Sequence, residues 1–204
     1  MPYAAPIEVV QAALHRIGEE SIASLDEASS AAQIAASNYE GIVDALFARH
    51  AWTFAKQTLD LTYQGAVDLG RWTHAFVIPS SVRNIRWVMR EGVRLRAGEY
   101  AIEAGRILTE SDDALQVVAT VRANEGDWPG DVAEAVVTRL QALFLESLCD
   151  KPQDARLLKR DAEAMIRLAI VRDKRQEPGV EVEFAPLAEA WRGSRQRRGA
   201  LVHG

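Results

Sequence analysis

Residues 29–54 constrain the fold most strongly, because a helical pattern ends there in a pair of aromatic residues. Apolar side chains recur at the three-to-four-residue spacing of one helix face, at Ala35, Tyr39, Ile42 and Leu46. This spacing predicts an amphipathic helix over residues 29–51. Trp52 and Phe54 then stand two residues apart, a spacing that favours a strand. The chain is therefore expected to pass from helix to strand near Trp52.

Three further segments have the helical period. A short helix is predicted over residues 7–17, after Pro6 and before Gly18. A long helix is predicted over residues 131–150, with Asp131 as its N-cap and Leu140 and Phe144 on its apolar face. Another is predicted over residues 152–176. Because only Lys151 and Pro152 separate the last two, they are expected to pack as an antiparallel pair.

Residues 52–123 change to short alternating runs, and glycines such as Gly92, Gly98 and Gly105 separate several of them. This pattern predicts a compact antiparallel β-meander between the second and third helices. The predicted fold class is α+β, mainly a helical bundle of three long helices plus a short N-terminal one, with a small inserted meander. Residues 1–176 are expected to form this body.

Residues 177–204 are predicted to form an extended C-terminal tail, since Pro178, Gly179 and Pro186 exclude a long helix. Apolar residues suited to docking come first, and a basic cluster follows: Val182, Phe184, Leu187, Trp191, Arg192, Arg195, Arg197 and Arg198. The arginines can contact nucleic acid, pair with an acidic protein surface, or stay solvated. Docking on a protein is the preferred interpretation, because apolar residues precede the arginines.

No enzyme signature is present: the chain has no P-loop, no dinucleotide glycine fingerprint, no HExxH and no GxSxG. The four histidines are scattered, and none has a second His or Cys at metal spacing. The single cysteine, Cys149, is interpreted as a buried small hydrophobe. We therefore expect no enzymatic activity, no cofactor and no metal.

Charge and hydropathy narrow the partner classes. A formal net charge of −5 disfavours a protein that wraps duplex DNA by neutralising its phosphates. No apolar run approaches the roughly 20 residues of a membrane-spanning helix, so no membrane association is expected. The opening MPYAAPIEVV has no basic region, which argues against a secretory signal and favours assembly in the cytoplasm.

The order of these pieces resembles the phage tail tubular protein A family of head-to-tail adaptors, which also resembles the adaptors of gene transfer agents. The family opens with a helix ending in Leu/Ile-Gly, a loop with a Ser-Leu pair, and a second helix leading to Trp-x-Phe-Ala. The matching residues are Ile17-Gly18, Ser24-Leu25 and Trp52-Thr53-Phe54-Ala55. Looser matches follow at Phe76–Pro79, Val82–Val88 and Trp128-Pro129, so that the resemblance covers about residues 7–176.

The resemblance implies a structural protein of a phage or phage-like particle, assembled in the bacterial cytoplasm. Members of this family form homo-oligomeric rings, usually dodecameric, between the portal protein above and a tail or stopper protein below, with double-stranded DNA passing through. The tail residues named above would dock on the portal. The body would be held rigid for ring formation by core residues, namely Tyr39, Ile42, Leu46, Trp52, Phe54, Leu140 and Phe144. The alternative is a nucleic-acid-binding module that uses the arginines of the tail.

Overall fold

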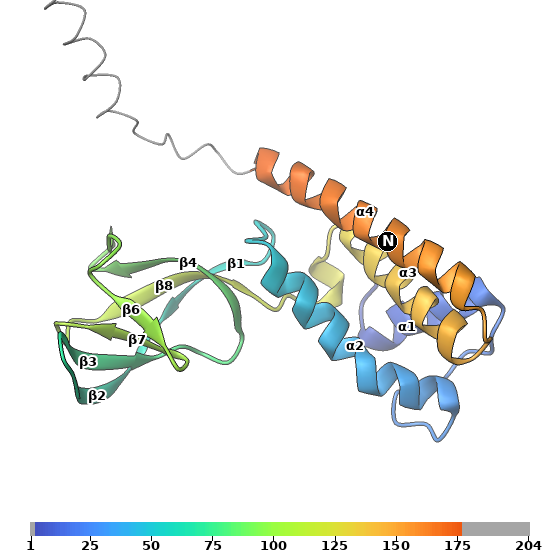
Figure 1. The fold of residues 1–204 in the computed structure, drawn as a ribbon, viewed down its shortest axis with the longest axis horizontal. Coiled ribbons are helices and arrows are strands. Elements are labelled where there is room, and N and C mark those ends of the chain that lie inside the picture. Colours follow the sequence, from blue (N-terminus) through green and yellow to red (C-terminus); the bar gives the residue numbers. More distant parts are fainter. Residues whose placement is uncertain (1–2, 177–204) are drawn as a thin grey trace, which may run out of the picture. The chain divides into compact units, whose positions relative to one another are not determined.

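The described chain begins and ends in helices and places all its strands between them (Figure 1). The computed structural model describes residues 3–176. The helices are α1 (Pro6–Ile17), α2 (Ser30–Arg49), α3 (Gly130–Ser147) and α4 (Pro152–Gln176), with a 3-10 turn η1 (Glu125–Asp127) before α3. The strands are β1 (Lys56–Asp60), β2 (Thr62–Leu69), β3 (Trp72–Val77), β4 (Val82–Arg90), β5 (Val93–Arg94), β6 (Ala101–Glu103), β7 (Arg106–Thr109) and β8 (Leu115–Val121).

Local sequence signals define the helix ends. The Ser29 hydroxyl accepts a hydrogen bond from the Ala32 amide and caps the start of α2. Gly18 adopts φ of 79°, a left-handed conformation that favours glycine, and ends α1. Asp131 is not the N-cap that the sequence predicts, because α3 begins one residue earlier, after Pro129.

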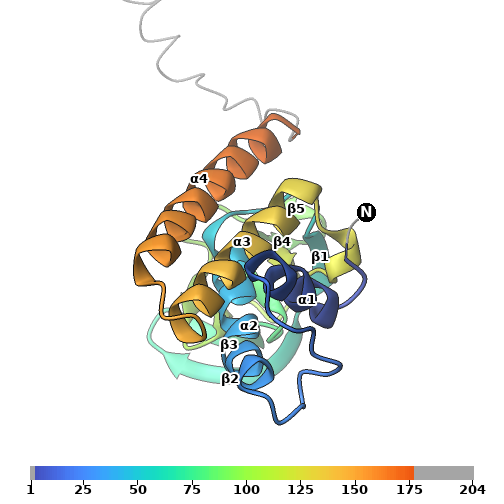
Figure 2. The same cartoon turned by 90° about the vertical axis from the view of Figure 1, so that its right-hand side faces the viewer.

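The helices share one apolar core in which α3 is central. Figure 2 shows α3 between α4 and α1, and α2 also packs against α3. Ten residues of α3 are buried, including Val137, Leu140 and Phe144, which have no exposed surface. The α4 helix contributes mostly small buried side chains, Ala155, Ala162 and Ala169, at intervals of seven residues. Such small residues bury little apolar area.

The strands form two four-stranded antiparallel sheets. One has the order β1-β8-β4-β5 and the other β2-β3-β7-β6. In the first sheet Leu59 and Val88 both pair with Val117, and in the second Phe76 pairs with Ile107. These residues belong to one apolar cluster with members from both sheets. The sheets therefore have a core of their own, separate from the core of the helices.

The prediction of a mainly helical bundle with a small meander is wrong. The protein is a mixed α+β structure, 45% helical and 25% strand. A meander pairs each strand with the next, whereas here β1 pairs with β8 and β3 pairs with β7. The chain crosses between sheets because each sheet needs the other to bury its apolar face. Alternation along single strands reveals the strands but not these partners.

The transition after α2 also differs from the prediction. The first strand begins at Lys56, so Trp52 and Phe54 belong to an irregular connection and not to a strand. The Trp52 side chain turns back into the helical core, where its indole nitrogen donates to the Leu46 carbonyl oxygen over 2.9 Å. The aromatic pair therefore completes the helical core at the point where the sheets begin.

Candidate interaction surface

The residues expected to support a ring lie together in the helical core. Tyr39, Leu46, Trp52, Leu140 and Phe144 are buried, and Ile42 and Phe54 are half-buried against the same cluster. The Phe54 ring lies 5.6 Å from the Trp52 ring and 5.8 Å from the Phe47 ring, measured between centroids. These side chains hold α2, α3 and the start of the β region together, and most of them have almost no surface to offer a partner.

The eight residues expected to dock on the portal lie outside the described residues. They are Val182, Phe184, Leu187, Trp191, Arg192, Arg195, Arg197 and Arg198.

A buried carboxylate fixes the C-terminal end of α4 to the segment after α2. Asp173 is 3% exposed, and its oxygens accept hydrogen bonds from the Thr53 amide at 3.0 and 3.1 Å and from the Thr53 hydroxyl at 2.6 Å. The His50 ring nitrogen Nε2 lies 3.0 Å from Asp173 Oδ2. Buried carboxylates need such partners, because desolvation without them is costly. The contacts account for this acidic residue as a structural link.

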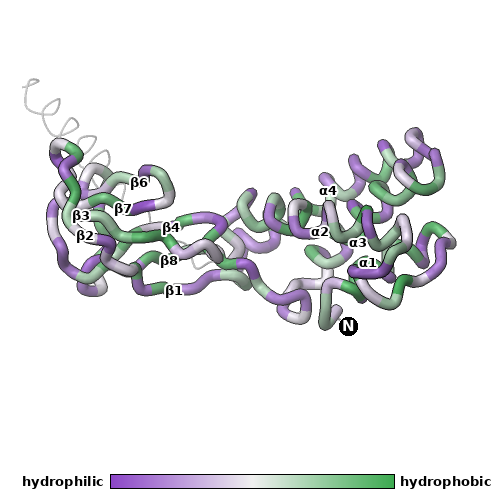
Figure 3. Tube along the Cα trace, turned by 90° about the horizontal axis from the view of Figure 1, so that it is seen from below, coloured by the Kyte–Doolittle hydropathy of each residue, from purple (hydrophilic) through white to green (hydrophobic). Residues whose placement is uncertain are grey.

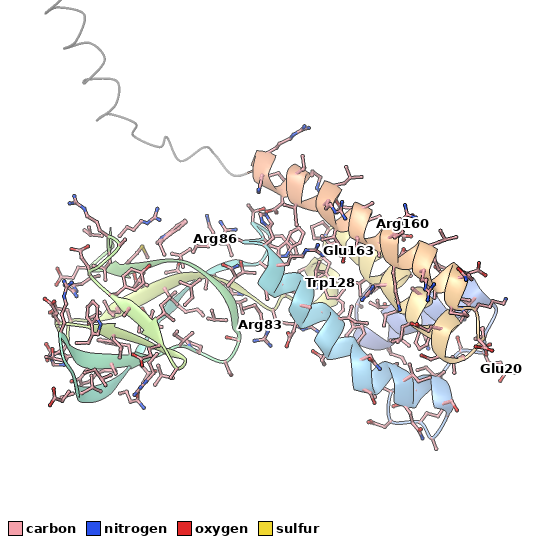
Figure 4. The ribbon with its side chains drawn as sticks, viewed as in Figure 1. Glu20, Arg83, Arg86, Trp128, Arg160 and Glu163 are labelled. Atoms are coloured by element: carbon pink, nitrogen blue, oxygen red, sulfur yellow. The ribbon has the colours of Figure 1, made fainter. Side chains whose placement is uncertain are left out.

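A second buried carboxylate joins α2 to the connection between β8 and α3. Glu125 is 5% exposed and accepts hydrogen bonds from the Tyr39 hydroxyl and from Arg122, each over 2.9 Å. Burial, together with the Glu125 charge, raises the pKa of Tyr39 above its ordinary value. The Arg122 guanidinium lies 5.8 Å from the centre of the Trp128 ring, which Figure 4 shows near α3. This network is also structural.

An open groove of about 400 Å³ lies over α3, between α2 and α4. Its walls combine apolar and small residues with a few polar ones: Ser37, Asn38, Gly41, Ile42, Ala45, Leu46, Arg49, Ala135, Val136, Arg139, Glu163 and Ile166. At one end Arg49 and Glu163 form a two-bonded ion pair, with Nη1–Oε1 at 3.0 Å and Nη2–Oε2 at 2.6 Å. Figure 4 shows Glu163 on the side of α4 toward α2.

The α2 side of the groove is unusually flat. Ser37, Gly41 and Ala45 follow one another at four-residue spacing and are exposed. Gly41 is not at positive φ, and a Cβ added there would meet no atom within 4 Å. Glycine inside a helix costs about 0.5–1 kcal/mol relative to alanine, and neither backbone conformation nor contacts within the chain require it here. Gly41 therefore leaves room on an open helix face.

Acidic residues border this flat face. Glu40 and Asp44 pair with Arg122 at 3.2 Å and with Arg83 at 2.7 Å. The side chains of both acids are more exposed than those of their arginine partners, 65% against 18% and 39% against 25%. Figure 4 shows Arg83 on the β4 side of α2. The solvent side of α2 thus carries small residues beside two carboxylates.

The solvent side of α4 has the opposite character. Leu157, Leu168 and Val171 are 56%, 70% and 49% exposed, and Ala164 lies exposed between them on the same helix face. Hydrophilic and hydrophobic residues follow one another along this helix (Figure 3). Single exposed apolar residues are ordinary, but an aligned set on one helix suggests an interaction surface.

Basic side chains line one flank of this apolar row. Arg156, Arg160, Arg167 and Lys174 are exposed and lie at helical spacing beside it. Arg160 and Arg167 also line a depression of about 490 Å³ next to the groove, together with Arg139, Lys159, Ala164 and the acids Asp161 and Glu163. The outer face of α4 therefore combines large apolar side chains with positive charge.

Sequence reasoning missed this outer face. It assigned α4 one apolar face, containing Leu158, Ala162, Met165, Ile166, Ala169 and Ile170, and these residues are buried or half-buried. The missed signal is the second apolar row, in which Leu157, Ala164, Leu168 and Val171 share a different helical face. A helix with one buried side would carry polar residues there.

The remaining candidates are the cysteine, possible metal ligands and possible membrane-spanning helices. Cys149 is half-buried and not fully buried as the sequence predicts. Its thiol lies 3.6 Å from a Glu19 oxygen. Desolvation raises the pKa of this thiol, which disfavours the reactive thiolate. Among residues 3–176 no group of three or more His, Cys, Asp or Glu side chains is arranged to hold a metal ion. No helix in the same range is long and apolar enough to cross a membrane.

Comparison of the sequence with protein-family models gives no match, and comparison with curated proteins gives none either.

Proposed function

We propose that the protein is a structural head-to-tail adaptor of a phage or phage-like particle. In this role it forms a homo-oligomeric ring beneath the portal protein, joins the capsid to a tail or stopper protein, and surrounds the DNA channel. The serial resemblance over residues 7–176 supplies the family, including the adaptors of gene transfer agents. It also supplies the expectation of a dodecamer.

The observation that carries the proposal is the aligned apolar row on α4. Leu157, Leu168 and Val171 expose large apolar side chains on a helix whose opposite face is already buried. An aligned set of exposed large apolar side chains favours an interaction surface. A subunit of an assembly uses such a surface to contact its neighbours.

The buried connections within the body also support the proposal. Asp173 and Glu125 each connect segments far apart in the sequence through buried hydrogen bonds. The helical core and the core between the sheets each consist of buried apolar residues. A body of this kind can transmit force between the capsid and the tail without rearranging its core.

The test uses the purified full-length chain, alone and mixed with the portal protein of the same particle. Native mass spectrometry and negative-stain electron microscopy should detect a ring of several copies on the portal. The chain alone can remain monomeric. A chain that never binds the portal and never forms a ring in its presence contradicts the proposal.

A variant lacking residues 177–204 separates docking from folding. Because the described body ends at residue 176, we expect the variant to keep the circular dichroism spectrum and cooperative unfolding of the body but to lose portal binding. Normal assembly of the truncated chain would contradict the docking role of Phe184, Leu187 and Trp191. Salt-sensitive binding of the full chain to duplex DNA, lost in the same variant, would instead favour the nucleic-acid-binding alternative.

A further inference from the structure

We propose that the outer face of α4 in one copy binds the groove between α2 and α4 of a second copy. The contact joins two unlike surfaces of the same chain. The inference rests on the proposed function, since it identifies the contact between neighbouring subunits of the ring.

The two surfaces are complementary in shape. The groove is walled on the α2 side by Ser37, Gly41 and Ala45, which leave space, and its floor on α3 includes Ala135 and Val136. The α4 face presents Leu157, Leu168 and Val171, which project from the helix. Large side chains on one helix that enter a channel beside small side chains on another allow the two backbones to approach closely.

The two surfaces are also complementary in charge. Glu40 and Asp44 lie on α2, paired within the chain with Arg122 and Arg83 but more exposed than these partners. Arg156, Arg160, Arg167 and Lys174 line one flank of the apolar row on α4. With the basic flank over the α2 carboxylates, opposite charges meet across the contact. The reverse placement would bring the basic flank toward Arg139 on the groove floor, so charge favours one orientation.

The occupant is a second copy and not the same chain, because α4 already forms one wall of the groove. Glu163 and Ile166 of α4 line the groove, while Leu168 and Leu157 face solvent. The apolar row of a helix cannot enter a groove that the same helix borders with its other side. When two copies bind in this way, the pair still has one unoccupied groove and one unoccupied α4 face. Further copies can therefore add by the same contact, and the assembly closes into a ring when the rotation between neighbouring copies permits.

Gly41 gives a variant that blocks the contact without disturbing the chain. A Cβ added at residue 41 meets no atom within 4 Å, and the backbone there is ordinary helix. We expect Gly41→Leu to leave the melting temperature unchanged or raised. The added side chain would occupy the space proposed for the α4 residues of the neighbouring copy.

Site-specific cross-linking tests the contact directly. In a full-length Cys149→Ser background, one sample carries Ala45→Cys in the groove and a second, with a different affinity tag, carries Leu168→Cys on α4. The samples are mixed at high protein concentration, with and without the portal protein of the same particle, and treated with a short bismaleimide. A matched control replaces Leu168→Cys with Glu8→Cys, an exposed position on α1.

We expect cross-linked heterodimers of Ala45→Cys with Leu168→Cys to form at least about tenfold faster than those of the control pair. Adding Gly41→Leu to the groove partner should reduce the rate to that of the control. A rate equal to the control, or a rate unaffected by Gly41→Leu in a chain that stays folded, would overturn the proposed contact.

The outcomes for the two proposals are distinguishable. A ring on the portal without this cross-link means that the adaptor role stands and that the subunits meet elsewhere, which overturns the inference. The cross-link without any portal-dependent ring supports the contact and contradicts the adaptor role. The contact would then build an open filament or a ring that does not need the portal.

Discussion

Replacing Asp173 with alanine should destabilise the protein strongly, because this carboxylate anchors α4 to the segment that follows α2. Asp173 is 3% exposed and accepts hydrogen bonds from the Thr53 amide and hydroxyl and from His50. The variant leaves these donors without their acceptor in a part-buried site. The neighbouring Ala162 and Ala169 bury little apolar area, so near this end α4 depends on Ile166, Ile170 and the Asp173 contacts.

The magnitude follows from the contacts. A hydrogen bond to a charged group contributes about 1.5–3 kcal/mol, and removing one partner of a buried ionic network costs about 3–5 kcal/mol. The variant also removes the desolvation cost of the carboxylate, so the individual contributions do not add. We therefore expect a loss of about 3 kcal/mol in the free energy of unfolding for Asp173→Ala. Asp173→Asn should lose less, since its amide oxygen can still accept from Thr53.

Equilibrium urea unfolding followed by circular dichroism measures the effect. The matched control is Asp161→Ala, an exposed acid on the same helix, which should change the free energy of unfolding by no more than about 0.5 kcal/mol. Hydrogen exchange provides a local measure, because the Thr53 amide should lose protection only in the Asp173 variants. An Asp173→Ala variant as stable as Asp161→Ala would refute the anchoring role.

Three further predictions concern single positions. Tyr39 should stay protonated at alkaline pH, because its pKa is raised in the folded chain. The unfolded chain loses this proton from about pH 10, so the free energy of unfolding should fall as pH rises further. Ultraviolet titration should show one of the four tyrosines ionising only on unfolding, and early ionisation of all four would contradict this. Arg16 lowers the pKa of Glu134 through a hydrogen bond, so the pair should lose its contribution to the free energy of unfolding as pH falls below about 4.3. Because both side chains are partly exposed, Glu134→Gln should flatten the acid side of the stability profile by less than about 1 kcal/mol. An identical profile would show that the pair contributes nothing. Gly18→Ala should cost about 1 kcal/mol in thermal unfolding, because a side chain there strains the left-handed backbone at the end of α1, and an unchanged melting temperature would contradict that reason.

The helical part of the fold was predictable because its signals are local. The helix expected over residues 29–51 runs from Ser30 to Arg49, and the one expected over residues 152–176 runs from Pro152 to Gln176. Capping by Ser29 and the breaks at Gly18 and Pro152 depend on residues within one turn. Such features can be recognised without knowing what packs against them.

The sheets and the candidate surface were less accessible, because they depend on distant residues. Nothing near Lys56 indicates that its strand pairs with residues around Thr120 and not with the next strand. Likewise, the sequence does not distinguish Leu168 from the buried apolar residues of α4, because the structure is needed to show which side of the helix is covered. Gly41 resembles a helix defect until the space beside it is seen. Sequence periodicity identifies faces but does not identify which face remains open.

The pairing of β1 with β8 gives the β region a property of its own. Lys56 lies opposite Thr120, and the Val121 amide donates to the Ala55 carbonyl oxygen over 2.9 Å. The chain thus enters and leaves both sheets through two adjacent backbone positions. Strands or hairpin loops between these positions can be lengthened, shortened or exchanged without altering the distance that the connection from α2 to α3 must span. The two sheets form a lateral insertion, so evolution or design can change what they contact while the helices keep their own arrangement.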